Sequence, residues 1–206
     1  MTKKQKKPYH HGNLRESLVR ASLEVIAEQG PEGFTLRDIA RRLGVAPSAP
    51  YRHFADKEEV LAAVAAECSE RLEAAMDAAA SGSEDPLERF RLAGLAYVRF
   101  AVENQAYFKV MSHAHISGQA PLRANVNDWL KHELAQLRAA QERGELSQLP
   151  VEDMMLAARC LTYGLVRLIV DGLEGFEGIS AARATQLAES ITNVLGLGLL
   201  PRTPNR

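Results

Sequence analysis

Two short helix patterns and one tight turn lie close together within residues 35–54. Thr35, followed three positions later by Asp38, is a capping-box pattern that starts a helix, and Gly44 ends that helix. A second short helix is expected just beyond. Two helices joined in this way form a helix-turn-helix, whose second helix enters the major groove of DNA. Eight or nine helical residues span about 12–14 Å, which fits a groove about 12 Å wide.

Two prolines leave the start of this second helix open between two positions. If Ser48 is the N-cap, Pro50 takes the second helical position, where no hydrogen bond is lost, and intrahelical bonding begins at Arg52. If Ala46 is the N-cap, Pro47 takes the first position and Pro50 the fourth, where proline removes the first intrahelical bond. With either cap, the fixed φ of proline stiffens the segment before it meets DNA.

Helix start and stop signals recur along the rest of the chain. Asn13 with Glu16 starts a first helix that Gly30 ends, and Asp56 with Glu59 starts a long one from Lys57 to about Ala79. Five more are expected at about 86–103, 105–115, 121–143, 150–172 and 181–198. Strand signals are weak, because aromatic content is only 6% and sustained alternation of apolar and polar residues is missing. The sequence therefore predicts an all-α fold.

Three regions are expected in this fold of about nine helices. Residues 1–12 form a basic flexible tail, residues 13–56 a three-helix DNA-binding domain with the helix-turn-helix, and residues 57–206 a helical bundle for ligand binding and dimerisation. Charge supports the division. Residues 1–54 contain ten lysines and arginines against five acidic residues, whereas the remainder contains fifteen against twenty-one. A basic head on an acidic body predicts that the head, and not the body, meets a polyanion.

The sequence resembles the tetracycline-repressor-like (TetR) family of transcriptional regulators. The resemblance is carried by "YHHGNLRESLVRASLEVIAEQG" at 9–30 and "FTLRDIARRLGVAPSAPYRHFADKEEVLAAV" at 34–64, together with the lysine-rich tail, about the first third of the chain. The position of Pro50 departs from the family, which has an apolar non-proline residue there in many members. The resemblance implies an all-helical homodimer built on its last two helices, with a ligand cavity in the body.

The DNA-contacting residues follow from residue type and from this resemblance. Arg37 is the candidate for bidentate readout of guanine, and Ser48 and Ala49 can reach base edges. Tyr51, His53 and Lys57 match the family's phosphate-clamping positions. The full set expected to contact DNA is Lys3, Lys4, Lys6, Lys7, Thr35, Leu36, Arg37, Pro47, Ser48, Ala49, Tyr51, Arg52, His53 and Lys57. Of these, Arg52 is open between a base contact and a surface salt bridge. Phe54, which is not among them, is expected in the core.

Apolar residues surround most of the helix expected at 150–172, so both of its sides must be covered. A second copy of the chain is a natural cover, and a central helix of a monomer is the alternative. The residues expected at this dimer interface are Leu161, Leu165, Ile169, Leu187, Ile191 and Val194.

Aromatic and apolar residues are abundant in the middle helices, where they are ordinary core or the lining of an apolar cavity. The candidate ligand pocket consists of Tyr97, Phe100, Phe108, Met111, Trp129 and Tyr163, with His113 or His132 as polar groups. The expected function is a sequence-specific transcriptional regulator, a homodimeric repressor that a small apolar effector releases from a pseudo-palindromic operator. The alternatives are a DNA-bound adaptor or a constitutive repressor without an effector.

An enzyme is the remaining alternative and the weakest. His113, His115, Asp128 and His132 are its only metal-like group, and an HxH spacing on a helix puts the two rings on opposite faces. No catalytic motif, cofactor or metal is expected. Cys68 and Cys160 lie far apart and are expected to be buried thiols. No apolar run reaches the length of a membrane span, so a cytoplasmic protein is expected.

Overall fold

The protein is described by a computed structural model. The structure describes the backbone of residues 14–116 and 122–199. It describes their side chains as well, except those of residues 112–116, 122–128 and 197–199. These residues form eight α-helices and one short 3₁₀ helix, and they contain no strand. The helices are α1 (Leu14–Gly33), α2 (Leu36–Leu43), the 3₁₀ helix η1 (Pro50–Arg52), α3 (Lys57–Ala80), α4 (Pro86–Glu103), α5 (Gln105–Ile116), α6 (Leu122–Glu142), α7 (Val151–Val170) and α8 (Ala181–Leu199). The all-α prediction is confirmed.

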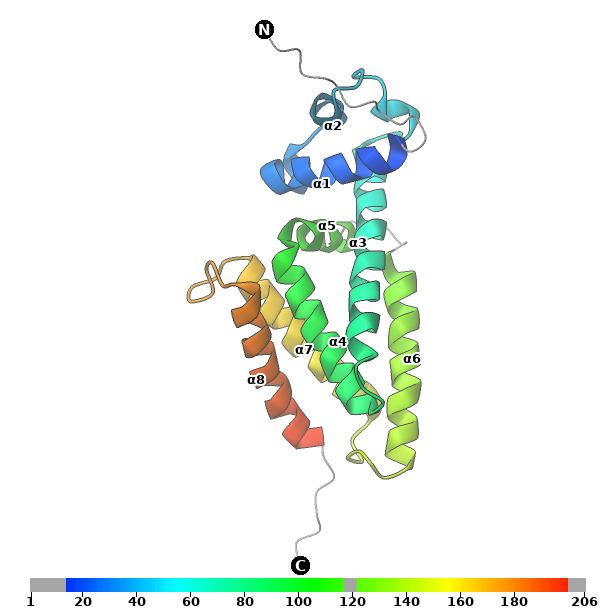
Figure 1. Ribbon diagram of the computed structural model, residues 1–206, viewed down its shortest axis with the longest axis vertical. Helices are drawn as coiled ribbons and strands as arrows, with labels where there is room; N and C mark the ends of the chain where they lie inside the picture. The colour runs from blue at the N-terminus through cyan, green and yellow to red at the C-terminus, as the bar shows by residue number, and fades with distance from the viewer. Residues whose placement is uncertain (1–13, 117–121, 200–206) are drawn as a thin grey trace, which may run out of the picture.

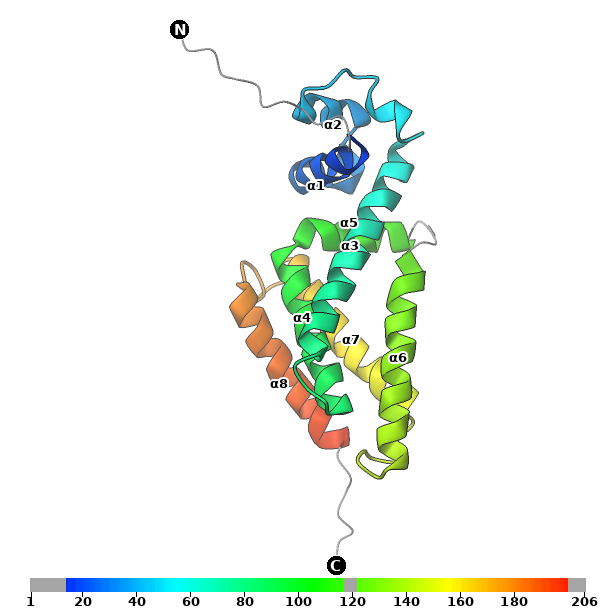
Figure 2. The same ribbon diagram turned by 45° about the vertical axis from the view of Figure 1, so that its right-hand side comes forward.

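The molecule has a small head and a larger helical body (Figure 1). Helices α1 and α2 and η1 form the head, and the long helix α3 runs from the head into the body. Helix α5 crosses between them and packs against both α1 and α3 (Figure 2). In the body, α4 packs against α7 and α8, whereas α6 packs along α3 and α4. The head is therefore joined to the body by one continuous helix and by one transverse helix.

One apolar core joins the head to α5. Val110 of α5 is fully buried in the same cluster as Phe34, Ile39 and Phe54 of the head. Phe54 is 1% exposed, which confirms that it is a core residue. A second cluster fills the space between α4, α5, α7 and α8. Met111 packs against both clusters, so the two cores are in contact through α5.

The predicted capping residues explain most helix boundaries. The carboxylate of Asp56 accepts from the N–H of Glu59 (2.9 Å), and that of Asp85 accepts from the N–H of Leu87 (2.9 Å), next to Pro86 at the first helical position. Both interactions satisfy N–H groups that have no partner inside the helix. The five body helices lie where the sequence places them, to within a few residues.

The end of α1 differs from its prediction. Gly30 has a positive φ of 77° and leaves the helical conformation, as expected, but the helix resumes after this kink and ends at Gly33. Pro31 follows the kink directly, and proline is well suited to the first position of a new helical turn. Asn13, the predicted cap at the other end, lies outside the described residues.

Candidate nucleic-acid interface and the helical body

The first helix of the helix-turn-helix is fixed at both of its ends. The side chain of Thr35 accepts from the N–H of Asp38 (3.3 Å), and the N–H of Thr35 donates to the Asp38 carboxylate (2.9 Å), so the predicted capping box is present. The hydrogen bonds from Thr35 hold the pKa of Asp38 below its usual value. At the other end Gly44 has a φ of 67°, and its N–H donates to the carbonyls of Ala40 and Arg41. Leu36, Ile39 and Ala40 face the core.

The segment beyond Gly44 differs from the predicted helix of eight or nine residues. The N–H of Ala49 donates to the carbonyl of Ala46 (2.9 Å), which closes a turn. One 3₁₀ turn then follows, in which the N–H of Arg52 donates to Ala49 (3.2 Å) and that of His53 to Pro50 (2.9 Å). Pro50 has no N–H to offer the carbonyl of Ala46, so an α-helical bond cannot form at that point. The predicted second α-helix is wrong in type and length, although bonding does resume at Arg52.

This turn presents most of the predicted contact residues to solvent. Pro47, Ser48, Tyr51 and Arg52 are exposed, with Tyr51 52% exposed although it is aromatic. Ala49 and His53 are half-buried. Pro50 is buried beneath them and attaches the turn to the head. The side chains of Tyr51 and Arg52 have no hydrogen-bond or ion-pair partner within residues 14–116 and 122–199, so they are available to a ligand.

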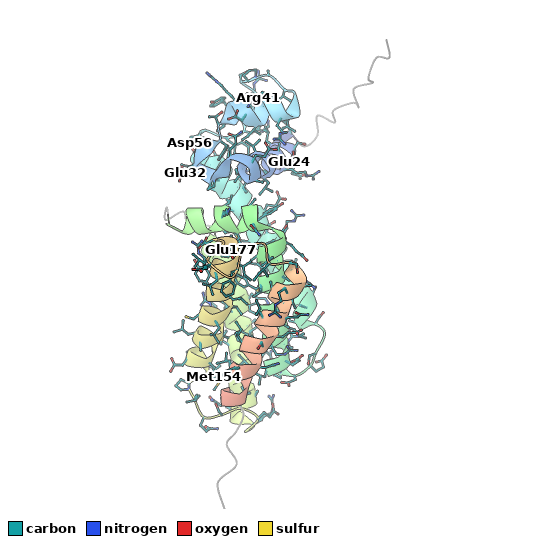
Figure 3. The ribbon with its side chains drawn as sticks, turned by 90° about the vertical axis from the view of Figure 1, so that its left-hand side faces the viewer. Glu24, Glu32, Arg41, Asp56, Met154 and Glu177 are labelled. Carbon is teal, nitrogen blue, oxygen red and sulfur yellow. The ribbon has the colours of Figure 1, made fainter. Side chains whose placement is uncertain are left out.

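The three arginines of α2 have different surroundings. Arg37 is exposed and unpaired within the described part of the chain. Arg41 forms an ion pair with Asp38 (2.5 Å), and Figure 3 shows Arg41 in the head, at the opposite end of the molecule from Met154. Arg42 pairs with two glutamates of α1 and holds the two helices together. Arg37 is thus the α2 arginine left free for an outside partner.

Two predicted contact residues also have a structural role. The Nζ of Lys57 donates to the carbonyl of Glu32 (2.6 Å) and lies 5.0 Å from the centre of the Phe34 ring, so it ties the start of α3 to the end of α1. Leu36 is 4% exposed, which leaves only its backbone N–H for a phosphate. The lysines of the tail, Lys3, Lys4, Lys6 and Lys7, lie outside the described residues.

Comparison with known proteins agrees with this geometry. Residues 18–64, which contain α2, the turn and η1, match the family described as bacterial regulatory proteins, tetR family. Residues 18–64 of the chain are thus a DNA-binding domain of the tetR family. Like the regulators of that family, the chain is a DNA-binding transcription regulator.

Other known proteins are similar to this chain over most of its length. The nucleoid occlusion factor SlmA of Vibrio vulnificus is 29% identical over 154 residues, 72% of this chain and 79% of the relative. A protein of unknown function from Rhodococcus sp. RHA1 has a TM-score of 0.78 at 25% identity and covers 95% of this chain and 100% of its own. The ketosteroid transcriptional regulator KstR2 of Mycobacterium tuberculosis has a TM-score of 0.68 at 21% identity, over 94% and 98%. At that identity the likeness shows the fold alone.

The residues predicted at the dimer interface do not share one surface. Leu165 is 6% and Ile169 4% exposed, because both pack inside the chain's own core against α4 and α8. Leu187 and Ile191 are partly buried against the same core. Leu161 and Val194 are exposed. The interface assignment of Leu165 and Ile169 is corrected accordingly, since side chains buried in one chain cannot also contact a partner.

Two exposed apolar side chains of α7, Leu156 and Tyr163, were not assigned to the dimer interface from the sequence, whereas Val194 of α8 was. Leu156 is 57% and Tyr163 50% exposed, and their spacing of seven residues puts them on one face of α7. Val194 of α8 is 71% exposed. An apolar helix does not reveal from sequence which of its sides faces its own chain, so Leu156 and Tyr163 gave no separate signal.

The predicted pocket residues lie in three different places. Phe108 contacts Tyr97 (ring centres 6.4 Å apart) and Tyr163 (6.1 Å) between α4, α5 and α7. Burial raises the pKa of the Tyr97 hydroxyl in this group. Met111 lies at its edge, and Phe100 pairs instead with Tyr107. The structure does not bring all six residues together, because Trp129 belongs to a different cluster.

The cluster that contains Trp129 lies between α3, α4 and α6. Trp129 stacks on Phe90, with ring centres 6.5 Å apart and planes 19° apart, next to the buried Ala80 and Ala93. Its Nε1 is buried and has no hydrogen-bond partner. Glu133, one turn further along α6, is 1% exposed, and its Oε2 is also buried without a partner. A buried polar group without a partner costs about 1–3 kcal/mol, so two on one helix are a notable feature.

No group of three or more His, Cys, Asp or Glu residues able to hold a metal occurs in the described ranges. The side chains of His113, His115 and Asp128 fall outside these ranges, and His132 is exposed. Cys68 is buried, and burial raises the pKa of its thiol, whereas Cys160 is exposed, contrary to its prediction. None of the helices described is both long and apolar enough to cross a membrane.

Proposed function

We propose that this DNA-binding regulator acts as a homodimeric repressor, and that a small, mostly apolar effector lowers its affinity for a pseudo-palindromic operator. The observation that carries the proposal is the outer face of the head. There Arg37, Ser48, Tyr51 and Arg52 are exposed. The side chains of Arg37, Tyr51 and Arg52 lack partners among the described residues. Guanidinium, hydroxyl and backbone N–H groups are the ones that contact base edges and phosphates.

Arg37 reads bases in this proposal, together with Ser48 and Ala49 at the turn. Tyr51, Arg52 and His53, with one of the remaining N–H groups of Lys57, hold phosphates. The start of α2 holds another phosphate through its N–H groups and Thr35, because a helix N-terminus carries a partial positive charge. The tail lysines add contacts along the backbone or in a minor groove.

Dimerisation rests on the exposed apolar face of α7 and α8. Leu156, Tyr163 and Val194 are each at least half exposed. Large apolar side chains gathered on two neighbouring helices are typical of an interface. A two-fold axis through this face relates two heads, and two heads read two half-sites about one helical turn of DNA apart, or slightly more.

The test begins by selecting bound fragments from random DNA, which yields the operator. Operator affinity is then measured against salt concentration. With about six to eight phosphate contacts, log affinity falls against log salt with a slope of about −5 to −7. A pseudo-palindrome with that slope supports the proposed binding mode. A slope near zero refutes the assigned contact face, because phosphate contacts always release counterions.

A second candidate function is a DNA-bound adaptor that recruits another protein without an effector. It is favoured by the relative that carries the name nucleoid occlusion factor, which matches 72% of this chain. A screen for small molecules that release the selected operator separates the two candidates. Release supports the effector-controlled repressor, and binders that never change operator affinity support the adaptor.

A further inference from the structure

Two buried polar atoms without partners lie on one side of α6. The indole Nε1 of Trp129 is a hydrogen-bond donor, and the Oε2 of Glu133 is an acceptor. The side chains are 6% and 1% exposed. Residues four positions apart lie one above the other on the same face of a helix, so both point into the space that α6 shares with α3 and α4.

Glu133 is only half satisfied by its ion pair. Its Oε1 accepts from the Nη2 of Arg89 (3.2 Å). The Nη1 of the same arginine donates to the carbonyls of Ala80 (3.2 Å) and Ser83 (3.5 Å), in the turn that joins α3 to α4. Arg89 therefore balances the charge of Glu133 and is held in place by the backbone, while Oε2 remains without a donor.

The surroundings of the Trp129 ring are apolar. Trp129 stacks on Phe90 and lies with two alanines, Ala80 and Ala93, while Met76 and Leu130 pack at the edge. Within the described part of the chain, neither Nε1 of Trp129 nor Oε2 of Glu133 has a hydrogen-bond partner. A ligand bound here must supply both a donor and an acceptor on an otherwise apolar molecule.

We propose that Trp129 and Glu133 form the polar end of the effector site, and that they select a neutral hydroxyl or primary amide group on an apolar molecule. This inference rests on the proposed effector function. A hydroxyl donates its hydrogen to Oε2 of Glu133 and accepts from the indole N–H of Trp129, and an amide does the same through its two atoms. A carboxylate offers no hydrogen and repels Glu133, whereas an ammonium group offers the indole no lone pair.

The position also connects the site to the head. Helix α3 continues from this cluster into the DNA-binding head. Glu133 is paired with Arg89 of α4, and Arg89 donates to backbone carbonyls at the α3–α4 turn. A ligand that moves Glu133 therefore also moves Arg89, and with it α4 and this turn. Such a ligand releases DNA only by as much as its affinity differs between the binding and non-binding arrangements of the heads.

Trp129 is the single tryptophan of the chain, so ¹⁵N-labelled protein gives one indole N–H signal. The full chain is titrated with four probes that share an octyl chain: 1-octanol, octanamide, octanoate and octylammonium. We expect octanol and octanamide to shift this signal and to bind about 10-fold more tightly than the two charged probes, the difference that one hydrogen bond makes. Equal affinity for all four, or an indole signal that does not move at saturating octanol, overturns the proposal and leaves an internal water as the partner.

Two variants test each half of the site by calorimetry. Glu133→Gln removes the negative charge and keeps the shape of the side chain. The repulsion of octanoate is then lost, so the 10-fold tighter binding of octanol over octanoate should fall to about 2-fold or less. Trp129→Phe removes the donor, so the preference for octanol over octylammonium should fall in the same way. Glu142→Gln, on the exposed end of α6, is the matched control and should change neither ratio. If both ratios survive both site variants, the proposal is wrong.

Operator affinity measured in the same titrations separates this inference from the proposed function. Selective binding at Trp129 without any loss of operator affinity keeps the site and refutes the effector-controlled repressor. An effector that releases the operator with unchanged affinity for the Glu133→Gln and Trp129→Phe proteins keeps the repressor and refutes the site.

Discussion

Arg37 and Arg41 lie one turn apart on α2 and are both exposed, but only Arg41 has a partner, Asp38. Arg37→Ala should relax the base preference at one position of each half-site by about 1–3 kcal/mol. Arg41→Ala is the matched control, because it removes the same charge from the same helix and leaves Arg37 in place. Binding profiles over randomised operators measure both. An unchanged profile for Arg37→Ala would show that this residue does not read bases.

Asp38 gives the head a dependence on pH. Hydrogen bonds from Thr35 lower its pKa in the folded state. Its stabilising effect is therefore fully present above the unfolded pKa of about 4, and it is lost as the pH falls through the lower folded value. The difference in free energy of unfolding between the wild type and Asp38→Asn should accordingly be smaller at pH ~3 than at pH ~6. Urea denaturation at the two pH values measures it.

Thr35→Ala provides the control for that measurement. It removes the side-chain hydrogen bond from Thr35, the main cause of the lowered pKa of Asp38, and keeps the backbone N–H that also donates to this carboxylate. As the loss of an N-cap it should itself cost about 1 kcal/mol. In the Thr35→Ala background, Asp38→Asn should produce a smaller difference with a weaker dependence on pH. The same pH dependence in both backgrounds would mean that another carboxylate is responsible.

At the scale of the helix, the same substitution should have opposite effects at two glycines. Gly44 ends α2 with a φ of 67°, whereas Gly164 lies inside α7, and an added Cβ meets nothing within 4 Å at either position. Gly44→Ala should destabilise the protein by about 1–2 kcal/mol through left-handed strain. Gly164→Ala should stabilise it by about 0.8–1 kcal/mol through helix propensity. Thermal denaturation of both variants checks the signs, and equal signs would contradict the argument.

Helix boundaries were predictable from sequence because capping residues, glycine and proline act locally. Thr35, Asp56 and Asp85 each cap the helix that the sequence assigns to them. The second helix of the helix-turn-helix was not predictable in the same way. Pro50 is compatible with a first helical turn, and only the bonds made around it show that a turn and a 3₁₀ segment form instead.

Side-chain orientation was harder to predict than helix position. Leu165 and Ile169 were expected at a dimer interface, but they face their own chain because α4 and α8 cover that side of α7. Trp129 was expected in one pocket with Tyr97 and Phe108, but it lies in the separate cluster between α3, α4 and α6. Both errors have one cause, since the side of an apolar helix that is buried depends on neighbours distant in sequence.

At the scale of the whole molecule, the exposed apolar face of α7 and α8 should decide the oligomeric state. Leu156→Glu combined with Val194→Glu places charges on this face without disturbing the core, because both side chains are more than half exposed. The double variant should sediment as a folded monomer. Its operator affinity should fall by about 10²–10⁴-fold, because one head alone loses the effective concentration of the second.

Leu149→Glu is the matched control for this experiment. Leu149 is 53% exposed but lies before α7, outside the proposed interface. The Leu149→Glu protein should remain a dimer with normal operator affinity. A dimer in the double variant would place the interface on another surface of the body.

Helix α3 runs unbroken from the body into the head, so a tilt of this helix at its body end would move the head. Its 24 residues make an arm about 36 Å long. A tilt of about 5° at the base swings the far end of such an arm through about 3 Å, close to the rise of one base pair, about 3.4 Å. In a dimer, two such arms moving apart change the spacing of the heads by almost two base pairs. A rearrangement of side chains in the body too small to alter the fold would then be enough to move both heads out of register with their half-sites.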